Sequence, residues 1–526
     1  MKKIFLLISM VLTMVVTSCT DDLNQHPIIE TDATAVYSEA SNYKKVLAKI
    51  YSSFVIAGQE QGGENADLSS NNGYDFLRGY INLQEAGTDE MASTWLEGDY
   101  IGNITFLSWD VNDPWVADTY YRAYYTIALC NELIRHCGDE EISKFSSSEQ
   151  ADIRIYKAEA RFLRALTYFY VLDLYGQGPF VDETVPVGSF IPQSYNARQL
   201  FEYVEGELKD NVENDLADTN EYGRASKAAA WTLLAKLYLN AEVYTGEARY
   251  TDCITYCKKV VGAGYSLEPD YQKLFNADNH LRTNELIFSF VVDATNTVSW
   301  GATTYIVCGQ CSNSSTQDPA KYGITNGWGM FRVRGELVDK FGDVSSSADK
   351  RCLFYTDGQS QWLDKAIDNQ ECGYFSEKFS NLTDAGDAAS NTSAVGVSTD
   401  YPVFRLADVY LMAAEAVVRG GSGYSREEVL GFLNLIRQRA YGDNSGNIND
   451  AQMNLDYIID ERARELYLEG CRRTDLIRFG MFTTDKYIWQ WKGGVVDGRA
   501  VDKKYNIYPI PASELSANPN LKNADY

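Results

Sequence analysis

The chain has 526 residues, 45% of them hydrophobic, and a formal net charge of −26 at pH 7. This composition is ample for a large core, and the negative charge argues against nucleic acid and anionic lipid head groups as partners. Its three histidines are too few for histidine-rich metal sites and argue against Ser/His/Asp catalysis. Because no Pro-rich, Gly/Ser-rich or charged linker divides the sequence, we expect one continuous body with insertions.

The N-terminus has the pattern of a signal peptide. Two lysines precede an apolar run over residues 4–16, and small residues then lead to Cys19. The run is about 13 residues long, whereas a membrane-spanning helix needs roughly 20. Residues 1–18 resemble a bacterial lipoprotein signal peptide, which implies cleavage before Cys19 and acylation of that cysteine. We therefore expect residues 19–35 to form a lipidated tether, with an ordinary secretory signal and a chance cysteine as the alternative.

Helical patterns dominate residues 36–263. Apolar residues recur at helical spacing from Tyr43 to Phe54, and a second helix is predicted over residues 115–137. Between them, residues 58–113 are rich in Gly, Asn, Asp and Ser and show little periodicity. This composition predicts a long surface insertion, a kind of segment that often carries function.

The stretch over residues 156–176, YKAEARFLRALTYFYVLDLYG, is apolar around most of its circumference. Such a pattern predicts a helix that is buried on nearly every side, and Gly176 supplies its end. Arg161 and Arg164 interrupt the apolar run. Since burying an unpartnered guanidinium costs several kcal/mol, we expect carboxylates or backbone carbonyls beside both arginines.

One pattern repeats along the chain. Its small and apolar residues fall at offsets 0, 3, 4 and 7, as in the tetratricopeptide repeat, beginning at Phe162, Trp231 and Val409. Partner helices are expected over residues 196–212, 251–261 and 425–441, the last with a Ser425/Glu428 capping box. We therefore predict a mainly α fold of about four tetratricopeptide-like hairpins in a superhelix, with long loop-rich insertions. The alternative is that buried helices share this spacing by chance.

The remaining chain divides into two regions. Residues 264–400 lack helical periodicity, contain one predicted strand over residues 286–292, and are rich in Gly, Asn and Ser with scattered aromatic residues. We predict that they form an irregular loop and strand lobe, the candidate ligand-binding region. Residues 401–526 hold the last helical hairpin and the C-terminal region.

The chain has ten cysteines, Cys19 included, and their spacing is not that of a disulfide framework. Cys308-x-x-Cys311 fits a disulfide or half of a metal site, but no second pair or nearby histidine completes a zinc site. The sequence predicts no metal and no cofactor, and it leaves open whether a calcium ion or any disulfide is present.

Several motifs are shared with one family. Residues 461–480 read ERARELYLEGCRRTDLIRFG, and Tyr508-Pro-Ile-Pro511 is followed by Asn518-Pro-Asn-Leu521. Further motifs are AEARFLRA at 158–165, FRLADVYL at 404–411 and Thr88-Asp89-Glu90. On these motifs the chain resembles, from end to end, the SusD/RagB family of Bacteroidetes outer-membrane lipoproteins. It departs from the family pattern at Cys471, Arg473, Thr474 and Ala524-Asp525, which are structural positions.

The resemblance implies a SusD-like α–α superhelix and a non-catalytic lipoprotein on the exterior face of the outer membrane. Asp21 and Asp22 resemble the acidic export signal of such lipoproteins. The implied function is to capture an oligosaccharide or polysaccharide and deliver it to a SusC-like TonB-dependent transporter, with neither glycan nor transporter identified. Alternatives are a peptide or another nutrient as ligand, a protein–protein adaptor, or a glycoside hydrolase that uses two carboxylates.

The ligand candidates are aromatic residues in the insertions, because the family's binding residues carry no motif that can be transferred. Pyranose faces stack on indole and phenol rings, while polar side chains bond the hydroxyl groups. Trp95, Trp300 and Trp328 are the leading candidates, and Tyr305 and Arg78 are secondary ones. Trp115 and Trp231, at helix positions, are predicted to be core residues.

Overall fold

The computed structural model describes residues 33–58, 66–68, 74–185, 188, 190–312, 317–390 and 396–526. The predicted signal peptide, Cys19 and most of the predicted tether lie outside these residues. Among the described helices, none combines the length and hydrophobicity needed to cross a bilayer.

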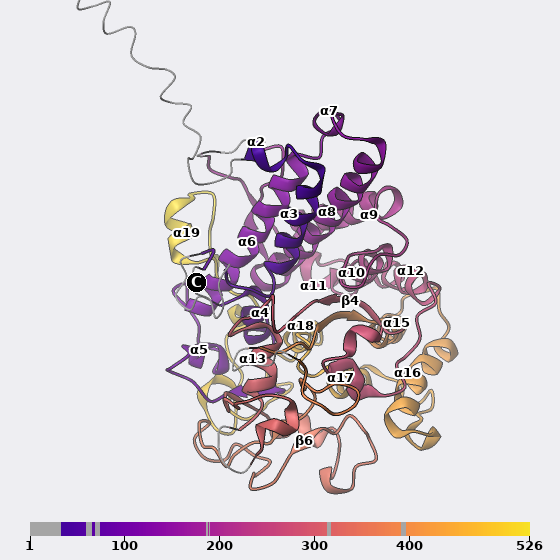
Figure 1. Ribbon diagram of the computed structural model, residues 1–526. Helices are drawn as coiled ribbons and strands as arrows, with labels where there is room; N and C mark the ends of the chain where they lie inside the picture. Colours follow the sequence, from indigo (N-terminus) through magenta and orange to yellow (C-terminus); the bar gives the residue numbers. More distant parts are fainter. Residues whose placement is uncertain are drawn as a thin grey trace, which may run out of the picture.

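Long helices pack side by side in the upper part of the molecule (Figure 1). Helix α8 contacts α3, α6 and α9, and its residues from Ala158 to Tyr175 are almost all buried, as predicted for the central helix. The helices of this part are α2 (Ala33–Val36), α3 (Ala40–Ser52), α6 (Pro114–Arg135), α7 (Asp139–Ile142), α8 (Ser147–Tyr175) and α9 (Ala197–Asn214).

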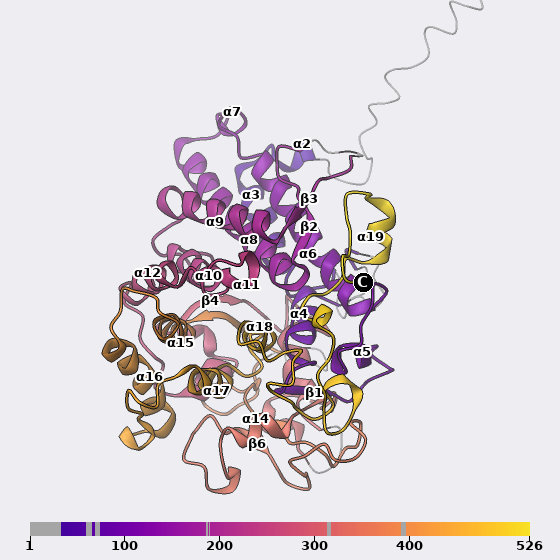
Figure 2. The same ribbon diagram turned by 180° about the vertical axis from the view of Figure 1, so that it is seen from behind.

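The helices continue as an arc around the body (Figures 1 and 2). Helix α10 packs on α12, α12 on α15, and α15 on α16. These contacts confirm the prediction of a mainly α fold built from helical hairpins. The arc consists of α10 (Lys227–Leu239), α11 (Ala241–Thr245), α12 (Tyr250–Val261), α15 (Leu406–Val418), α16 (Arg426–Tyr441), α17 (Leu455–Leu466) and α18 (Arg472–Arg478).

Local sequence explains how α8 begins and ends. Ser146 and Glu149 form a capping box at its start, and Gly176 ends it in the left-handed region at φ 64°. The predicted partners of the two arginines are present. Arg161 binds Glu207, Asp210 and Asp215, whereas Arg164 binds Glu183 and Glu207. These ion pairs connect α8 to α9 and to the loop around Glu183 that precedes α9.

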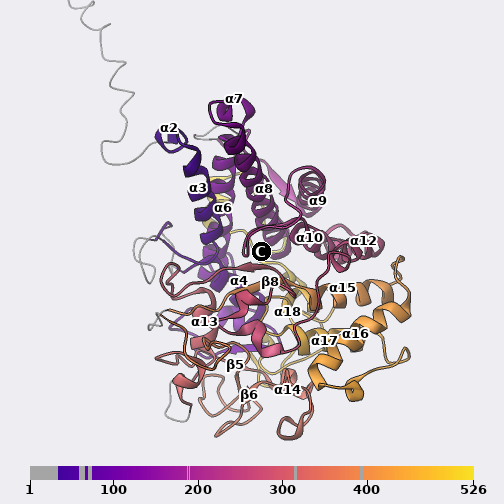
Figure 3. The same ribbon diagram turned by 45° about the vertical axis from the view of Figure 1, so that its right-hand side comes forward.

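A loop-rich lobe lies at the foot of the helices (Figure 3). Its strands form antiparallel pairs: β1 (Met91–Ser93) with β5 (Phe331–Val333), β4 (Leu286–Phe290) with β8 (Tyr401–Arg405), and β6 (Phe354–Tyr355) with β7 (Phe375–Ser376). The predicted strand over residues 286–292 is therefore present as β4. A further pair, β2 (Gln177–Pro179) with β3 (Ser194–Asn196), joins α8 to α9.

Short helices connect these parts. The α-helices are α4 (Phe76–Glu85), α5 (Gly102–Thr105), α13 (Ala302–Gly309), α14 (Gly335–Asp339) and α19 (Ala512–Ala517). The 3-10 helices are η3 (Tyr271–Phe275), η4 (Asn279–Leu281), η5 (Pro319–Tyr322), η6 (Val344–Ser346), η7 (Asn444–Gly446), η8 (Lys492–Gly494) and η9 (Lys503–Asn506).

Helix α4 differs from the prediction, because residues 58–113 were expected to be a surface loop. All but one of its residues are buried, including Arg78, Asn82, Gln84 and Glu85. The apolar residues Phe76, Leu77, Tyr80 and Ile81 do recur at helical spacing. This pattern spans only ten residues inside a polar segment, so the prediction missed it.

Buried ion pairs join the C-terminal motif to the rest of the body. The Glu465 carboxylate binds Arg351 at 3.0 Å and Arg405 at 2.6 Å, and it also binds Arg439. Burial alone would raise the pKa of Glu465, but the surrounding guanidinium groups lower it to about 2. We call Glu465 and these three arginines the Glu465 cluster. It connects α17, α16, β8 and the lobe.

The described cysteines, from Cys130 to Cys471, are all free thiols. Cys308 and Cys311 are both buried, and burial raises the pKa of each thiol to about 12. The disulfide that the sequence left open for this pair is therefore not formed.

Candidate ligand-binding surface

Trp300 and Trp328 lie next to each other although they belong to separate segments. Their ring centroids are 5.6 Å apart with an interplanar angle of 40°. Trp300 is 42% exposed at the end of the loop that follows β4, and Trp328 is 8% exposed in the segment that precedes β5. An exposed indole therefore rests beside a largely buried one.

Trp95 is brought to the same edge by the pairing of β1 with β5. The backbone N–H of Thr94 donates to the carbonyl oxygen of Met330 at 2.7 Å, and the Thr94 hydroxyl donates to that of Gly329 at 2.9 Å. Since Gly329 directly follows Trp328, these bonds hold the backbone of Trp95 next to that of Trp328. The Trp95 side chain is 42% exposed. We call Trp95, Trp300 and Trp328 the tryptophan surface.

A buried carboxylate, that of Asp75, fixes the loop that carries Trp300. It caps α4 by accepting the backbone N–H of Arg78 at 3.0 Å. It also accepts the Ser299 hydroxyl at 2.6 Å and the backbone N–H of Ala302 at 3.1 Å. A Cβ atom on Gly301 would lie 1.7 Å from the Asp75 carboxylate, so this close approach requires glycine.

Arg78 lies directly beneath the tryptophan surface. Its Nη1 donates to the carbonyl oxygen of Trp300 at 2.7 Å, and its Nη2 donates to both carboxylate oxygens of Asp99 at 2.9 and 3.0 Å. The guanidinium also stacks 3.7 Å from the ring centroid of Tyr74 and 4.5 Å from that of Tyr305. Burial raises the pKa of Asp99, and the adjacent guanidinium opposes that rise.

The structure corrects the predicted role of Arg78 and Tyr305. The two side chains are 2% and 0% exposed, so a ligand on the surface does not reach them. The Tyr305 hydroxyl instead donates to the Asn82 side chain at 2.6 Å, which ties α13 to α4. Both residues support the surface from below. Their burial depends on contacts between distant segments, which residue type alone does not indicate.

Tyr100 is a further exposed aromatic residue that sequence analysis did not single out. It is 59% exposed and follows Asp99, the partner of Arg78. Its backbone adopts a left-handed conformation, with φ 55°. The available signal was its position in the same insertion as Trp95.

The predicted core tryptophans divide. Trp115 is 1% exposed, and its indole N–H donates to the carbonyl oxygen of Asp99 at 2.7 Å. Trp231 is only half-buried, with the Lys259 amino group 5.7 Å from its ring centroid. The prediction is therefore confirmed for Trp115, and Trp231 packs against the core as a partly buried residue.

Trp95 and Trp300 therefore present exposed indole rings on a fixed buried framework. Their faces suit the C–H groups of a sugar ring. Within the described residues, no group of three or more His, Cys, Asp or Glu side chains is placed to hold a metal ion. The class that this geometry defines is a binding protein with an aromatic recognition surface.

Comparison with known proteins identifies the family. A model of the SusD family matches residues 353–526. The chain is 32% identical to the "Starch-binding protein SusD" of Bacteroides thetaiotaomicron, over 97% of this chain and 96% of that protein. It is 24% identical to the "SusD-like protein P25" of Formosa agariphila, over 97% and 95%. The chain therefore belongs to the SusD family.

Solved structures show the same fold. A SusD superfamily protein from Parabacteroides distasonis has a TM-score of 0.70 and 21% identity, over 92% of this chain and 99% of that chain. The surface glycan-binding protein A from Bacteroides thetaiotaomicron, in complex with laminarihexaose, has a TM-score of 0.69 and 19% identity over the same shares. SusD proteins are carbohydrate-binding, non-catalytic proteins associated with the outer membrane.

Proposed function

We propose that this protein captures an oligosaccharide or polysaccharide at the cell surface and delivers it to a SusC-like TonB-dependent transporter. The observation that carries this proposal is the tryptophan surface, where Trp95 and Trp300 are exposed and Trp300 lies beside Trp328 and above the buried Arg78. Two relatives support it, one named for starch and one solved with laminarihexaose.

The two relatives suggest which ligands to test. Starch and laminarihexaose, the ligands that their names give, are both built from glucose. Glucans are therefore the ligands that we propose to test first.

Affinity electrophoresis in gels that contain starch or laminarin tests this function. Retardation of the mature chain by either glucan, and loss of retardation in Trp300→Ala, supports the proposal. Leu435→Ala is a matched control, since Leu435 is a 46% exposed apolar residue on α16. Absence of binding to a broad glycan array would overturn the proposal and favour a peptide or another nutrient.

The anchor that we propose is an acylated Cys19, which follows from the lipobox-like sequence before it. Through this lipid the protein would be held on the exterior face of the outer membrane. Labelling with a radioactive fatty acid tests the anchor. Cys19→Ala should lose the label and leave the membrane fraction, whereas retained label and surface exposure would contradict it.

The transporter is the partner that gives capture a purpose, because a tethered binder that performs no chemistry must pass its ligand on. We expect an interface larger than about 2,000 Å² in total, as in lasting complexes. Gentle detergent extraction through a tag on this chain should recover a barrel of larger mass. Recovery of this chain alone, at native expression and in several detergents, would contradict the partnership.

A further inference from the structure

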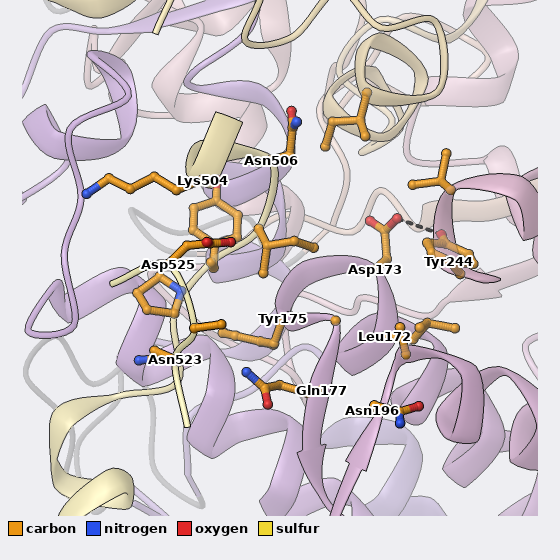
Figure 4. A pocket seen from close by; sticks show the side chains of 18 of the residues that line it. Leu172, Asp173, Tyr175, Gln177, Asn196, Tyr244, Lys504, Asn506, Asn523 and Asp525 are labelled. Carbon is orange, nitrogen blue, oxygen red and sulfur yellow. Dashed lines mark hydrogen bonds between the residues drawn. The ribbon is translucent and has the colours of Figure 1, made fainter. Parts of the chain in front are cut away.

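A pocket lies at the C-terminal end of α8, away from the tryptophan surface. It has a volume of about 470 Å³ and is lined by the end of α8, by α11, by α18 and by the C-terminal segment from Lys504 onward (Figure 4). Its volume falls within the roughly 300–1,000 Å³ of small-molecule sites. Arg78 in the first turn of α4 supports the tryptophan surface, whereas Gln84 near its end binds Asp173 in the pocket wall.

The walls of this C-terminal pocket are largely apolar. Two of its aliphatic residues stand at the rim, because Val243 is 44% exposed and Ile507 is 37% exposed. The remaining apolar lining includes Leu172, Ile477 and the tyrosine rings at 175, 244, 508 and 526. Apolar atoms and aromatic rings of this kind contact the C–H faces of a sugar.

Side-chain amides from separate segments enter the same space. Figure 4 shows Gln177 and Asn196 on one side of the pocket and Asn506 on the opposite side. Gln177 Nε2 donates to the carbonyl oxygen of Lys522 at 2.6 Å, while Asn196 and Asn506 each accept a bond through Oδ1. Within the described chain, Gln177 Oε1 and the NH₂ groups of Asn196 and Asn506 have no protein partner. These groups provide one acceptor and two amide donors for hydroxyl groups.

The charges of the pocket do not favour an ionic ligand. Asp173 accepts from Gln84 at 2.8 Å, from the Tyr244 hydroxyl at 2.7 Å and from the Thr474 hydroxyl at 2.7 Å, so its carboxylate is part of the wall. Arg473 lies 3.7 Å from the same carboxylate and balances its charge. At the rim, Lys504 and Asp525 carry opposite charges.

We propose that the C-terminal pocket is a second carbohydrate site, which takes a neutral saccharide of one or two sugar rings. The free amides of Gln177, Asn196 and Asn506 bond its hydroxyl groups, and the aliphatic and tyrosine walls contact its C–H faces. The proposal takes only its ligand class from the proposed function. It assigns binding to residues that share no contact with the tryptophan surface, so the two sites are separable by mutation.

Calorimetric titration of the folded mature chain with maltose and laminaribiose tests this site. Val243→Trp should abolish disaccharide binding by filling the pocket from an exposed position. Asn506→Ala should weaken it about threefold to tenfold, as expected for one lost hydrogen bond. Leu435→Trp, on an exposed position of α16, is the matched control for Val243→Trp and should bind as wild type does.

Trp300→Ala separates this inference from the proposed function. Disaccharide binding that survives Trp300→Ala but not Val243→Trp supports the C-terminal pocket, whatever the result with long glucans. Disaccharide binding that is lost in Trp300→Ala and unchanged in Val243→Trp would overturn it, because the tryptophan surface then accounts for all binding. Failure of both disaccharides to bind wild-type protein would also overturn it.

Discussion

The tryptophan surface and the Glu465 cluster differ in the type of residue that forms them and in how far those residues are exposed. The surface consists of uncharged rings on loops, and two of its three indoles are 42% exposed. The cluster is a set of charges on two helices, one strand and one turn, and Glu465 is fully buried among three arginines. The residues of the recognisable motif hold the body together, whereas the residues that we propose for ligand binding lie where no motif exists. Variants in the two regions should therefore affect different measurements.

The largest expected effect comes from Glu465→Ala, because it leaves Arg351, Arg405 and Arg439 without a shared carboxylate. Breaking a buried ion pair on one side costs about 3–5 kcal/mol. Urea unfolding should show this loss, while the folded variant should still bind glucan. Glu202→Ala, on an exposed position of α9, is the control and should change the unfolding free energy by less than about 0.5 kcal/mol. Equal stability of Glu465→Ala and wild type would contradict the cluster's structural role.

Arg78→Met tests whether one buried residue supports both the stability of the fold and the proposed glucan binding. The substitution keeps an apolar stem but leaves the buried Asp99 unpaired and releases the carbonyl oxygen of Trp300. We expect a loss of about 3 kcal/mol in unfolding free energy and weaker glucan binding in the same protein. Calorimetric unfolding and glucan titration measure the two effects. Full glucan affinity in this variant would mean that the loop of Trp300 keeps its position without Arg78.

Trp300→Ala should affect binding alone. Loss of an aromatic anchor weakens ligand binding by about 1–3 kcal/mol, whereas a half-exposed ring adds little to the core. Isothermal titration with maltohexaose or laminarihexaose measures the loss, and the melting temperature should stay close to that of wild type. The opposite pattern, with a lower melting temperature and unchanged affinity, would mean that Trp300 has a structural role, as Glu465 does.

A smaller effect concerns pH. Glu85 and Glu90 are buried carboxyl groups that face each other. Burial is the main cause of their raised pKa values: that of Glu85 lies well above its ordinary range, and that of Glu90 is about 7. Because the folded protein retains protons that the unfolded chain releases above about pH 4.5, this pair makes stability fall as pH rises from about 4.5 through 7. The lowered pKa of Glu465 has the opposite sign, since its contribution is lost only as pH falls below about 4.5.

Glu85→Gln should reduce this decrease in stability with pH. Its amide can donate a hydrogen bond to Glu90 without first binding a proton. We expect the unfolding free energy between pH 5 and pH 8 to vary by about 1 kcal/mol less than in wild type. Urea unfolding at several pH values measures this difference, with Glu202→Gln as control. An unchanged pH dependence would mean that the pair holds no extra proton.

Much of the helical body was predictable from local sequence. The apolar circumference of α8, its end at Gly176, and the carboxylate partners of Arg161 and Arg164 all follow from short-range pattern and from the cost of burying charge. The capping box of Ser425 and Glu428 is present for the same reason. Such signals lie within a few turns of chain and survive without knowledge of the fold.

The candidate site was predictable only in its residue types. Aromatic residues in loops indicated Trp95, Trp300 and Trp328, but the approach of their three segments depends on the β1–β5 pairing and on the bond from Ser299 to Asp75. The burial of Arg78 and Tyr305 depends on α4, a ten-residue helix that the prediction missed inside a polar segment. Contacts across more than two hundred residues leave no periodic trace in the chain.

The fit of Gly301 against Asp75 has an evolutionary consequence. One end of the loop that carries Trp300 is fixed at Gly301, because a Cβ atom there would collide with the Asp75 carboxylate. Its crest, from Asp293 to Val298, is bound mainly by a turn that Asp293 itself closes with Thr295, Asn296 and Thr297. Within the crest, Thr295 and Asn296 are exposed, whereas Ala294 and Val298 are buried. Substitutions at these two exposed positions can therefore vary the surface beside Trp300 while Gly301 keeps its place.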